Sequence, residues 1–275
     1  MITTDALGSL YNQFTRREYV HPDPLEVLYD YPEAADREVA GLVAACLSYG
    51  RVRSILASVR DALSRMPSPR AWLTEATTDT LRDAFAGFRH RFATGEQMAA
   101  LLLGARRLVE RHGSLNAAFV ARLTSGDETV ADALAGFAAE LREAAGGLDA
   151  HLLPCPARGS ACKRLHLFLR WMVRCDAVDP GGWAGVSPRQ LVVPLDVHMG
   201  RLCRILGLYS QKSASLKAAL SITQSFLEIE PDDPVKYDFA LSRIGILEDC
   251  NGRYRAGCSL CELSECCLRP DEWKP

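Results

Sequence analysis

The chain has 275 residues, of which 48% are hydrophobic and 24% are charged, a composition that is ordinary for a globular protein and excludes disorder as the main state. No apolar run approaches the ~18 residues of a membrane helix, and the N-terminus lacks the apolar stretch of a signal peptide, so we expect a cytoplasmic protein without a membrane partner. The 32 basic and 34 acidic residues nearly balance, so any nucleic-acid site must be local.

Helical periodicity dominates the sequence, and no segment alternates hydrophobic and polar residues as a half-buried strand does, so we predict an all-α fold. The first predicted helix starts near Asp36, a suitable N-cap, because hydrophobic residues recur on one helical face from Val39 to Leu47, and Gly50 suits its C-terminal cap. Further helices are predicted, in chain order, at about 53–65, 96–112, 115–123, 129–144, 160–174, 197–206 and 234–247. The glycine- and proline-containing segment 175–194 is predicted to be a long functional or flexible connection.

Lys163 and Asp196 are the candidates for amine chemistry. Only five of the 32 basic residues are lysines, which draws attention to a lysine that starts an apolar helix. A neutral amine can attack a carbon to form a Schiff base while a carboxylate moves the proton, and arginine cannot act in this way. The alternative is that Lys163 extends into solvent and Asp196 only caps its helix.

Three segments around this pair resemble the signature of the helix-hairpin-helix (HhH-GPD) DNA glycosylases. They are Leu-Leu-Pro at 152–154, Gly-Ser-Ala-Cys-Lys at 159–163 and Val-Pro-Leu-Asp-Val-His-Met at 193–199. The resemblance implies two interlocked helical subdomains: a helical barrel at 36–168 that ends in the helix-hairpin-helix, and a second subdomain formed by 1–35 and 169–275. It also implies that Lys163 attacks the deoxyribose carbon bearing the damaged base, with Asp196 as its acidic partner. Members with this lysine excise the base and then cleave the strand by β-elimination.

Two features depart from the family pattern. The hairpin reads Pro-Cys-Pro-Ala-Arg-Gly-Ser at 154–160 in place of a compact Gly-x-Gly turn, and the interval between Lys163 and Asp196 is longer than in the commonest members. The longer interval is more similar to the archaeal 8-oxoguanine glycosylase branch, so we expect an oxidised purine, 8-oxoguanine above others, as the excised base. The whole chain also resembles an uncharacterised bacterial family related to this superfamily. The alternatives are a non-catalytic helix-hairpin-helix DNA-binding protein and a monofunctional glycosylase for uracil or an alkylated base.

Five of the ten cysteines lie close together near the C-terminus, at Cys250, Cys258, Cys261, Cys266 and Cys267. In a reducing compartment such a cluster favours a metal site, either a [4Fe-4S] cluster or zinc, over disulfides. The segment resembles the C-terminal iron-sulfur loop of the endonuclease III branch. This resemblance implies a [4Fe-4S] cluster held by Cys250, Cys258, Cys261 and Cys267, with Cys266 as the alternative fourth ligand.

A local basic surface is predicted between residues 151 and 210, where eight basic residues face three acidic ones. We therefore expect a monomer that binds double-stranded DNA containing a damaged base and associates with the nucleoid. The predicted DNA contacts are Arg51, Arg158, Arg164 and His198.

Base excision requires the nucleotide to leave the stack, so one residue must fill the gap and others must receive the base. By their places in the family, Tyr49 or Arg51 is the predicted gap-filling residue. The predicted base pocket contains Trp171, Asp238 and Phe239.

Overall fold

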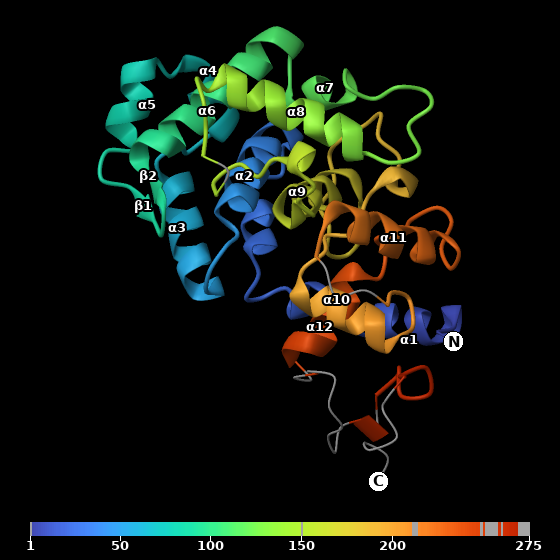
Figure 1. The fold of residues 1–275 in the computed structure, drawn as a ribbon. Helices are drawn as coiled ribbons and strands as arrows, with labels where there is room; N and C mark the ends of the chain where they lie inside the picture. The colour runs from blue at the N-terminus through green and yellow to red at the C-terminus, as the bar shows by residue number, and fades with distance from the viewer. Residues whose placement is uncertain are drawn as a thin grey trace.

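Helices provide almost all regular structure in the computed structural model, which describes residues 2–149, 151–210, 214–247, 250, 258–259 and 261–268 (Figure 1). The α-helices are α1 (Thr4–Phe14), α2 (Ala34–Leu47), α3 (Val52–Ser64), α4 (Pro69–Glu75), α5 (Thr78–Ala84), α6 (Gly95–His112), α7 (Leu115–Val120), α8 (Ala131–Ala144), α9 (Lys163–Val173), α10 (Val197–Ile205), α11 (Leu216–Leu227) and α12 (Asp238–Leu247). The 3-10 helices are η1 (Arg17–Tyr19), η2 (Pro24–Asp30), η3 (Pro156–Arg158) and η4 (Pro188–Gln190). The predicted all-α class is confirmed, apart from one short hairpin in which β1 (Arg89–His90) pairs antiparallel with β2 (Ala93–Thr94).

Helix α2 lies at the centre of the fold. Every residue from Glu38 to Leu47 is buried, as expected for a helix that is apolar on all sides. The elements η2, α3, α4, α7 and α9 all pack against it. At Gly41 an added Cβ would come within 3.2 Å of the Phe168 ring, so the absence of a side chain lets α2 and α9 approach closely. This contact fixes the helix that carries Lys163.

The remaining helices surround this centre in two groups. Helix α6 packs against α4, α5, α7 and α8, whereas α1 packs on α12 and α10 also packs on α12 (Figure 1). The N-terminal helix therefore lies beside α12, the last helix of the described chain, at the end of the molecule nearest the described residues 261–268 (Figure 1). Among the described residues, no helix is both long enough and apolar enough to cross a bilayer.

Two buried arginines, Arg170 in α9 and Arg174 at its C-cap, hold the long connection in place. Arg170 pairs with Asp179 and Asp238, and Arg174 pairs with Asp179 and with Asp233, whose carboxylate is 2.8 Å from the Arg174 Nε. Burial raises the pKa of Asp179 to about 6, so this carboxyl is still ionised at neutral pH between the two guanidinium groups. Buried charges are tolerated only when they are paired in this way. The first part of the connection that was predicted to be functional or flexible is therefore held in place by buried ion pairs.

Two predicted N-caps, Asp36 and Asp233, use their carboxylates in tertiary contacts instead, so α2 and α12 do not begin where they were predicted. Helix α2 begins before Asp36, whose carboxylate accepts a hydrogen bond from the backbone N–H of Arg70 at 2.7 Å. It ends at Leu47, and Gly50 adopts a left-handed φ of +108° in the following turn. Asp233 pairs with Arg174, and α12 starts four residues later than the predicted 234.

The buried side chain of His166 makes the packing of α9 testable through the pH dependence of stability. It is fully buried in α9, and within the described part of the chain neither ring nitrogen has a hydrogen-bond partner. Burial lowers the pKa of His166 from 6.5 to about 4. Between these two values the unfolded chain binds a proton that the folded chain excludes, so the free energy of unfolding falls as the pH drops, by on the order of 3 kcal/mol.

We predict that His166→Leu removes this component of the pH dependence, measured by urea denaturation at about pH 7.5 and about pH 4.5. The control is Leu169→Ala, which truncates another buried side chain of α9 without a titratable group; it should lower the stability at both pH values and retain the wild-type dependence. An identical loss of stability on acidification in the wild type and in His166→Leu would contradict the prediction.

Candidate active site

The structure brings Lys163 and Asp196 together at the heads of two helices. Lys163 is the first residue of α9, and Asp196 is the N-cap of α10. The Lys163 Nζ donates a hydrogen bond to Asp196 Oδ2, while Asp196 Oδ1 accepts one from the Met199 N–H at 2.8 Å. The side chains remain 40% and 31% exposed, so the pair can be reached from solvent. Asp196 therefore both caps α10 and binds the amine of Lys163, so the capping role and the role as acidic partner are compatible.

The carboxyl of Asp196 has a lowered pKa. Its burial alone would raise the pKa, but the Lys163 ammonium, its hydrogen bond and the Met199 N–H together outweigh that effect. Asp196 is consequently a carboxylate at neutral pH, ready to hold the proton-bearing amine in one orientation.

A depression of about 330 Å³ opens beside the lysine. Three parts of the chain line it: the loop before α9 with the first two residues of that helix, the residue before Asp196, and the residue before the N-cap of α11. The lining residues are Pro154, Ser160, Ala161, Cys162, Lys163, Arg164, Leu195 and Ala214. Cys162 adopts a left-handed conformation with φ +41°, which costs a residue with a Cβ about 1–3 kcal/mol. The loop is braced against the start of α11, since the Leu216 N–H donates to the Gly159 carbonyl at 2.9 Å. Sequence reasoning missed the contribution from α11, because no spacing rule links residues 50 positions apart.

Arg164, a predicted DNA contact, turns inward in this structure. Its guanidinium donates to the backbone carbonyls of Cys46, Leu152 and His151, the last at 2.7 Å, and it lies over the Tyr49 ring at 4.9 Å. These contacts tie α9 to the end of α2 and to the loop after α8. The residue serves here as a structural brace, and its donors are directed at carbonyls and not at a phosphate.

The other predicted DNA contacts differ in their settings. Arg51 is exposed at the N-cap of α3, and His198 is exposed in the first turn of α10, close to Asp196. The side chain of Arg158 lies outside the described part of the structure. Of the two predicted gap-filling residues, Arg51 is open to solvent, whereas Tyr49 is half-buried and donates its hydroxyl to the His90 carbonyl at 3.1 Å.

The residues predicted to form a base pocket are all buried. Trp171 and Phe239 are each 1% exposed, so neither ring offers a face to an incoming base in this conformation. Asp238 pairs with Arg170, and burial raises its pKa while Arg170 and Lys163 act in the opposite direction. Asp238 therefore lies within electrostatic reach of the lysine, behind the site and not in an open cavity. Their role in base recognition stays a prediction.

The described part of the cysteine segment forms turns. The Cys261 N–H donates to the Cys258 carbonyl at 3.3 Å, which places these two residues on one turn, and Cys250 and Cys261 pack against the hydrophobic core. Thiolates on such a turn are chemically suited to a cluster or to zinc. However, within the described residues no three or more cysteine, histidine or acidic side chains are grouped closely enough to hold a metal ion. The ligand set of Cys250, Cys258, Cys261 and Cys267 stays a prediction from spacing.

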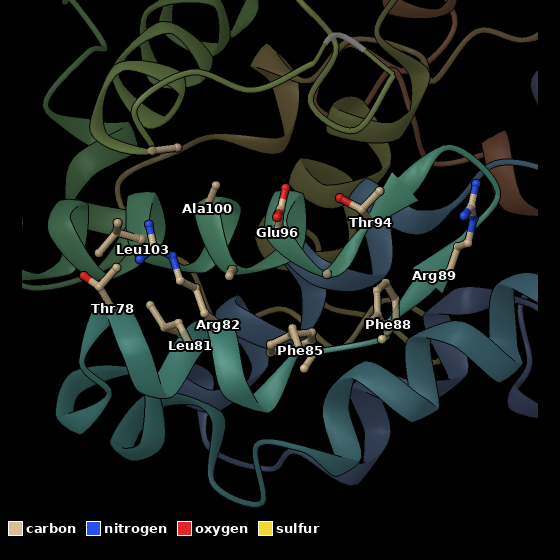
Figure 2. Close-up of a pocket in the computed structure, with 15 residues that line it drawn as sticks. Thr78, Leu81, Arg82, Phe85, Phe88, Arg89, Thr94, Glu96, Ala100 and Leu103 are labelled. Atoms are coloured by element: carbon tan, nitrogen blue, oxygen red, sulfur yellow. The ribbon is translucent and has the colours of Figure 1, made fainter.

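A second cavity, of about 950 Å³, lies between α5 and α6 (Figure 2). Leu81, Phe85 and Leu103 supply apolar surface, and Arg82, Arg89 and Glu96 are its charged residues. None of the predicted catalytic, DNA-binding or pocket residues lines it. We therefore place the candidate chemistry at Lys163 and not in this larger cavity.

Fold and site together define a helical protein with an accessible lysine–aspartate pair at the heads of two helices. The family model described as "Protein of unknown function (DUF2400)" matches residues 23–247, so the chain belongs to this family. The match includes Lys163 and Asp196 and ends before the cysteine segment. No curated protein and no solved structure gives a significant match to the chain.

The double use of Asp196 predicts how its variants behave. Asp196→Ala should lower the free energy of unfolding by about 1 kcal/mol, because α10 loses its cap, whereas Asp196→Asn should cost less because asparagine caps well. Chemical denaturation measures both effects. The matched control is Ser215→Ala, which removes the N-cap of α11 and should cost a similar amount without touching the lysine. Equal stabilities for Asp196→Ala and the wild type would show that the cap contributes nothing.

Proposed function

We propose that this protein is a DNA base-excision repair glycosylase with AP-lyase activity, acting on double-stranded DNA with an oxidised purine, 8-oxoguanine above others. The observation that carries the proposal is the accessible hydrogen bond between Lys163 and Asp196, at the two positions that match the HhH-GPD signature. The helical fold agrees with that superfamily. We further propose that the protein works as a monomer in the cytoplasm, at the nucleoid.

The proposed reaction uses the lysine as nucleophile. The lone pair of Nζ bonds to C1′ of the extruded nucleotide, and the bond from C1′ to the base breaks with its electron pair passing to the base, which takes up a proton. The sugar ring opens to give an imine. Loss of a C2′ proton then expels the 3′ phosphate, and hydrolysis of the imine returns the free lysine.

Asp196 would hold the proton that the amine must lose. Because the pKa of Asp196 is lowered, its carboxylate is a weak proton acceptor in the resting site. Removal of water by bound DNA would disfavour the charged pair and assist proton transfer from Nζ to Oδ2. Asp196 can then stabilise the positive charge that develops on the sugar.

Borohydride trapping tests the nucleophile. Wild-type protein with duplex carrying 8-oxoguanine should give a covalent adduct of protein and DNA, because borohydride reduces the imine to a stable amine. Lys163→Gln should give none and should lose strand cleavage by at least ~100-fold, while Lys163→Arg should behave like Lys163→Gln because a guanidinium forms no imine.

The control substrates are undamaged duplex and duplexes with uracil, an alkylated base or an abasic site. Excision of uracil or an alkylated base without trapping would support the monofunctional alternative. Salt-sensitive duplex binding with neither excision nor trapping, unchanged in Lys163→Arg, would replace the proposal by the non-catalytic binding protein.

We also propose that Cys250, Cys258, Cys261 and Cys267 hold a [4Fe-4S] cluster. The support is their spacing and the single turn that carries Cys258 and Cys261. Anaerobically purified protein should be brown and should contain iron and acid-labile sulfide. Cys261→Ser should lose the colour, whereas Cys175→Ser, a change in an exposed cysteine elsewhere, should keep it. Colourless protein that contains zinc would contradict the cluster and support zinc.

A further inference from the structure

One phenylalanine stands apart from the other eight. Phe92 is 65% exposed at the tip of the β1–β2 hairpin, whereas every other phenylalanine of the chain is buried. Single exposed hydrophobic residues are common on proteins, so exposure alone assigns no role. Three features around Phe92 do suggest a role: the hairpin is firmly attached, exposed arginines lie near it, and it contacts a residue bound to Arg164.

The hairpin is rigidly attached to the body. The buried His90 ring places Nε2 at 3.0 Å from the Tyr49 carbonyl and Nδ1 at 2.9 Å from the Ser58 hydroxyl. Since a carbonyl only accepts, Nε2 carries the proton and Nδ1 accepts from Ser58, which is the neutral imidazole. Burial lowers the pKa of His90 in agreement with this form. The hairpin is thus locked to the middle of α3 and to the turn after α2.

The hairpin tip also has an unusual backbone. Arg91 occupies the first position of the two-residue turn with φ +53°, where glycine is the usual residue. Its guanidinium packs over the neighbouring turn, so that a Cβ at Gly50 would lie 2.9 Å from it. An arginine is therefore kept where the backbone favours glycine, and its side chain stands beside the exposed ring of Phe92.

Exposed arginines lie on the hairpin and at the start of α3, the helix that packs against β1. We call Phe92 together with four exposed arginines the hairpin patch: Arg51, Arg53, Arg89, Arg91 and Phe92. Within the described chain, none of these arginines takes part in an ion pair. By contrast, Arg170 and Arg174 of the predicted basic window are buried against aspartates. A group of exposed arginines without an ion pair among the described residues therefore lies on the hairpin and at the start of α3, two elements that are in contact (Figure 1).

Contacts connect this patch to the candidate active site. The Phe92 ring meets the His151 ring edge-on with centroids 5.9 Å apart. The carbonyl of His151 is held by Arg164, the residue after Lys163, at 2.7 Å. The hairpin tip and the first turn of α9 are therefore linked through His151, whose ring contacts Phe92 and whose carbonyl binds Arg164.

We propose that the hairpin patch is a wedge for duplex DNA, in which the arginines bind phosphates and Phe92 enters between two neighbouring base pairs. An apolar ring that unstacks a base step, with cations on both sides to bind the backbone, has the chemistry that such insertion needs. This inference deepens the proposed function, because an unstacked nucleotide next to the wedge is the one that Lys163 would reach. Unstacking itself requires no catalysis and can be tested separately.

The test uses a short duplex with a tetrahydrofuran abasic-site analogue and 2-aminopurine as the adjacent base, and Lys163→Gln protein so that no chemistry occurs. Binding should increase the 2-aminopurine fluorescence because the base loses its stacking partner. Phe92→Ala should abolish most of this increase and weaken duplex binding by about 10-fold. Ile246→Ala, which truncates another exposed hydrophobic residue, is the control and should behave like the parent.

The arginines have their own readout. Arg91→Gly should keep or raise the thermal stability, because glycine suits the turn, and should lower the slope of log affinity against log salt by about 1. Arg16→Ala, a change in an exposed arginine of another surface, should leave the slope unchanged. The folded state of each variant is checked by its melting transition.

The outcomes separate the two proposals. Fluorescence enhancement that depends on Phe92 without borohydride trapping would retain the wedge and reject the lyase. Wild-type trapping rates on duplex with Phe92→Ala, or an unchanged fluorescence increase, would reject the wedge and retain the lyase. Equal affinity for single-stranded DNA or RNA, with the same loss on Phe92→Ala, would reassign the patch to single-strand stacking.

Discussion

The buried ion pairs of α9 are the constraint on which the rest of the structure depends. Arg170 and Arg174 lie one turn apart inside the protein, where a charge without a partner is prohibitively costly, so the aspartates must come to them. Asp179 brings in the long connection, Asp233 the turn before α12, and Asp238 the first residue of α12 itself. A helix held so firmly at its C-terminal end presents its first residue in a defined place, about 16 Å away at 1.5 Å per residue.

Much of this architecture follows from hydrophobic periodicity. Eight predicted helices correspond to helices in the structure, since long apolar stripes leave few alternatives. Helices α1, α4, α5 and α11 are not predicted. Helices α4 and α5 have seven residues each, and such a short segment gives the helical period little chance to appear. The hairpin was missed for the same reason. With two residues in each strand, it depends on the tertiary lock at His90 more than on its own sequence pattern.

The candidate site was partly predictable from the sequence. The lysine and the aspartate could be assigned, whereas the arginines could not. Helix-head positions and amine chemistry were enough to bring Lys163 and Asp196 together as candidates, and the structure places them in contact. Arginines could not be assigned in the same way, because a guanidinium binds backbone carbonyls and buried carboxylates as readily as phosphates. Arg164 turns to carbonyls and Arg170 to aspartates, and only their three-dimensional surroundings decide this. Trp171 is buried for a related reason: a large ring on an apolar helix satisfies core packing first.

The two carboxylate oxygens of Asp196 have different partners: Oδ1 accepts from the Met199 N–H and caps α10, and Oδ2 accepts from the Lys163 amine. An inactive Asp196 variant would therefore be ambiguous, because a frayed first turn of α10 shifts the same atoms that the missing charge would have influenced. Among the residues that the structure describes, the Lys163 side chain binds Asp196 and caps no helix. Mutagenesis at the two positions therefore differs. A substitution of Lys163 removes the amine alone, whereas a substitution of Asp196 separates the charge from the helix cap only if the new side chain, such as asparagine, still caps α10.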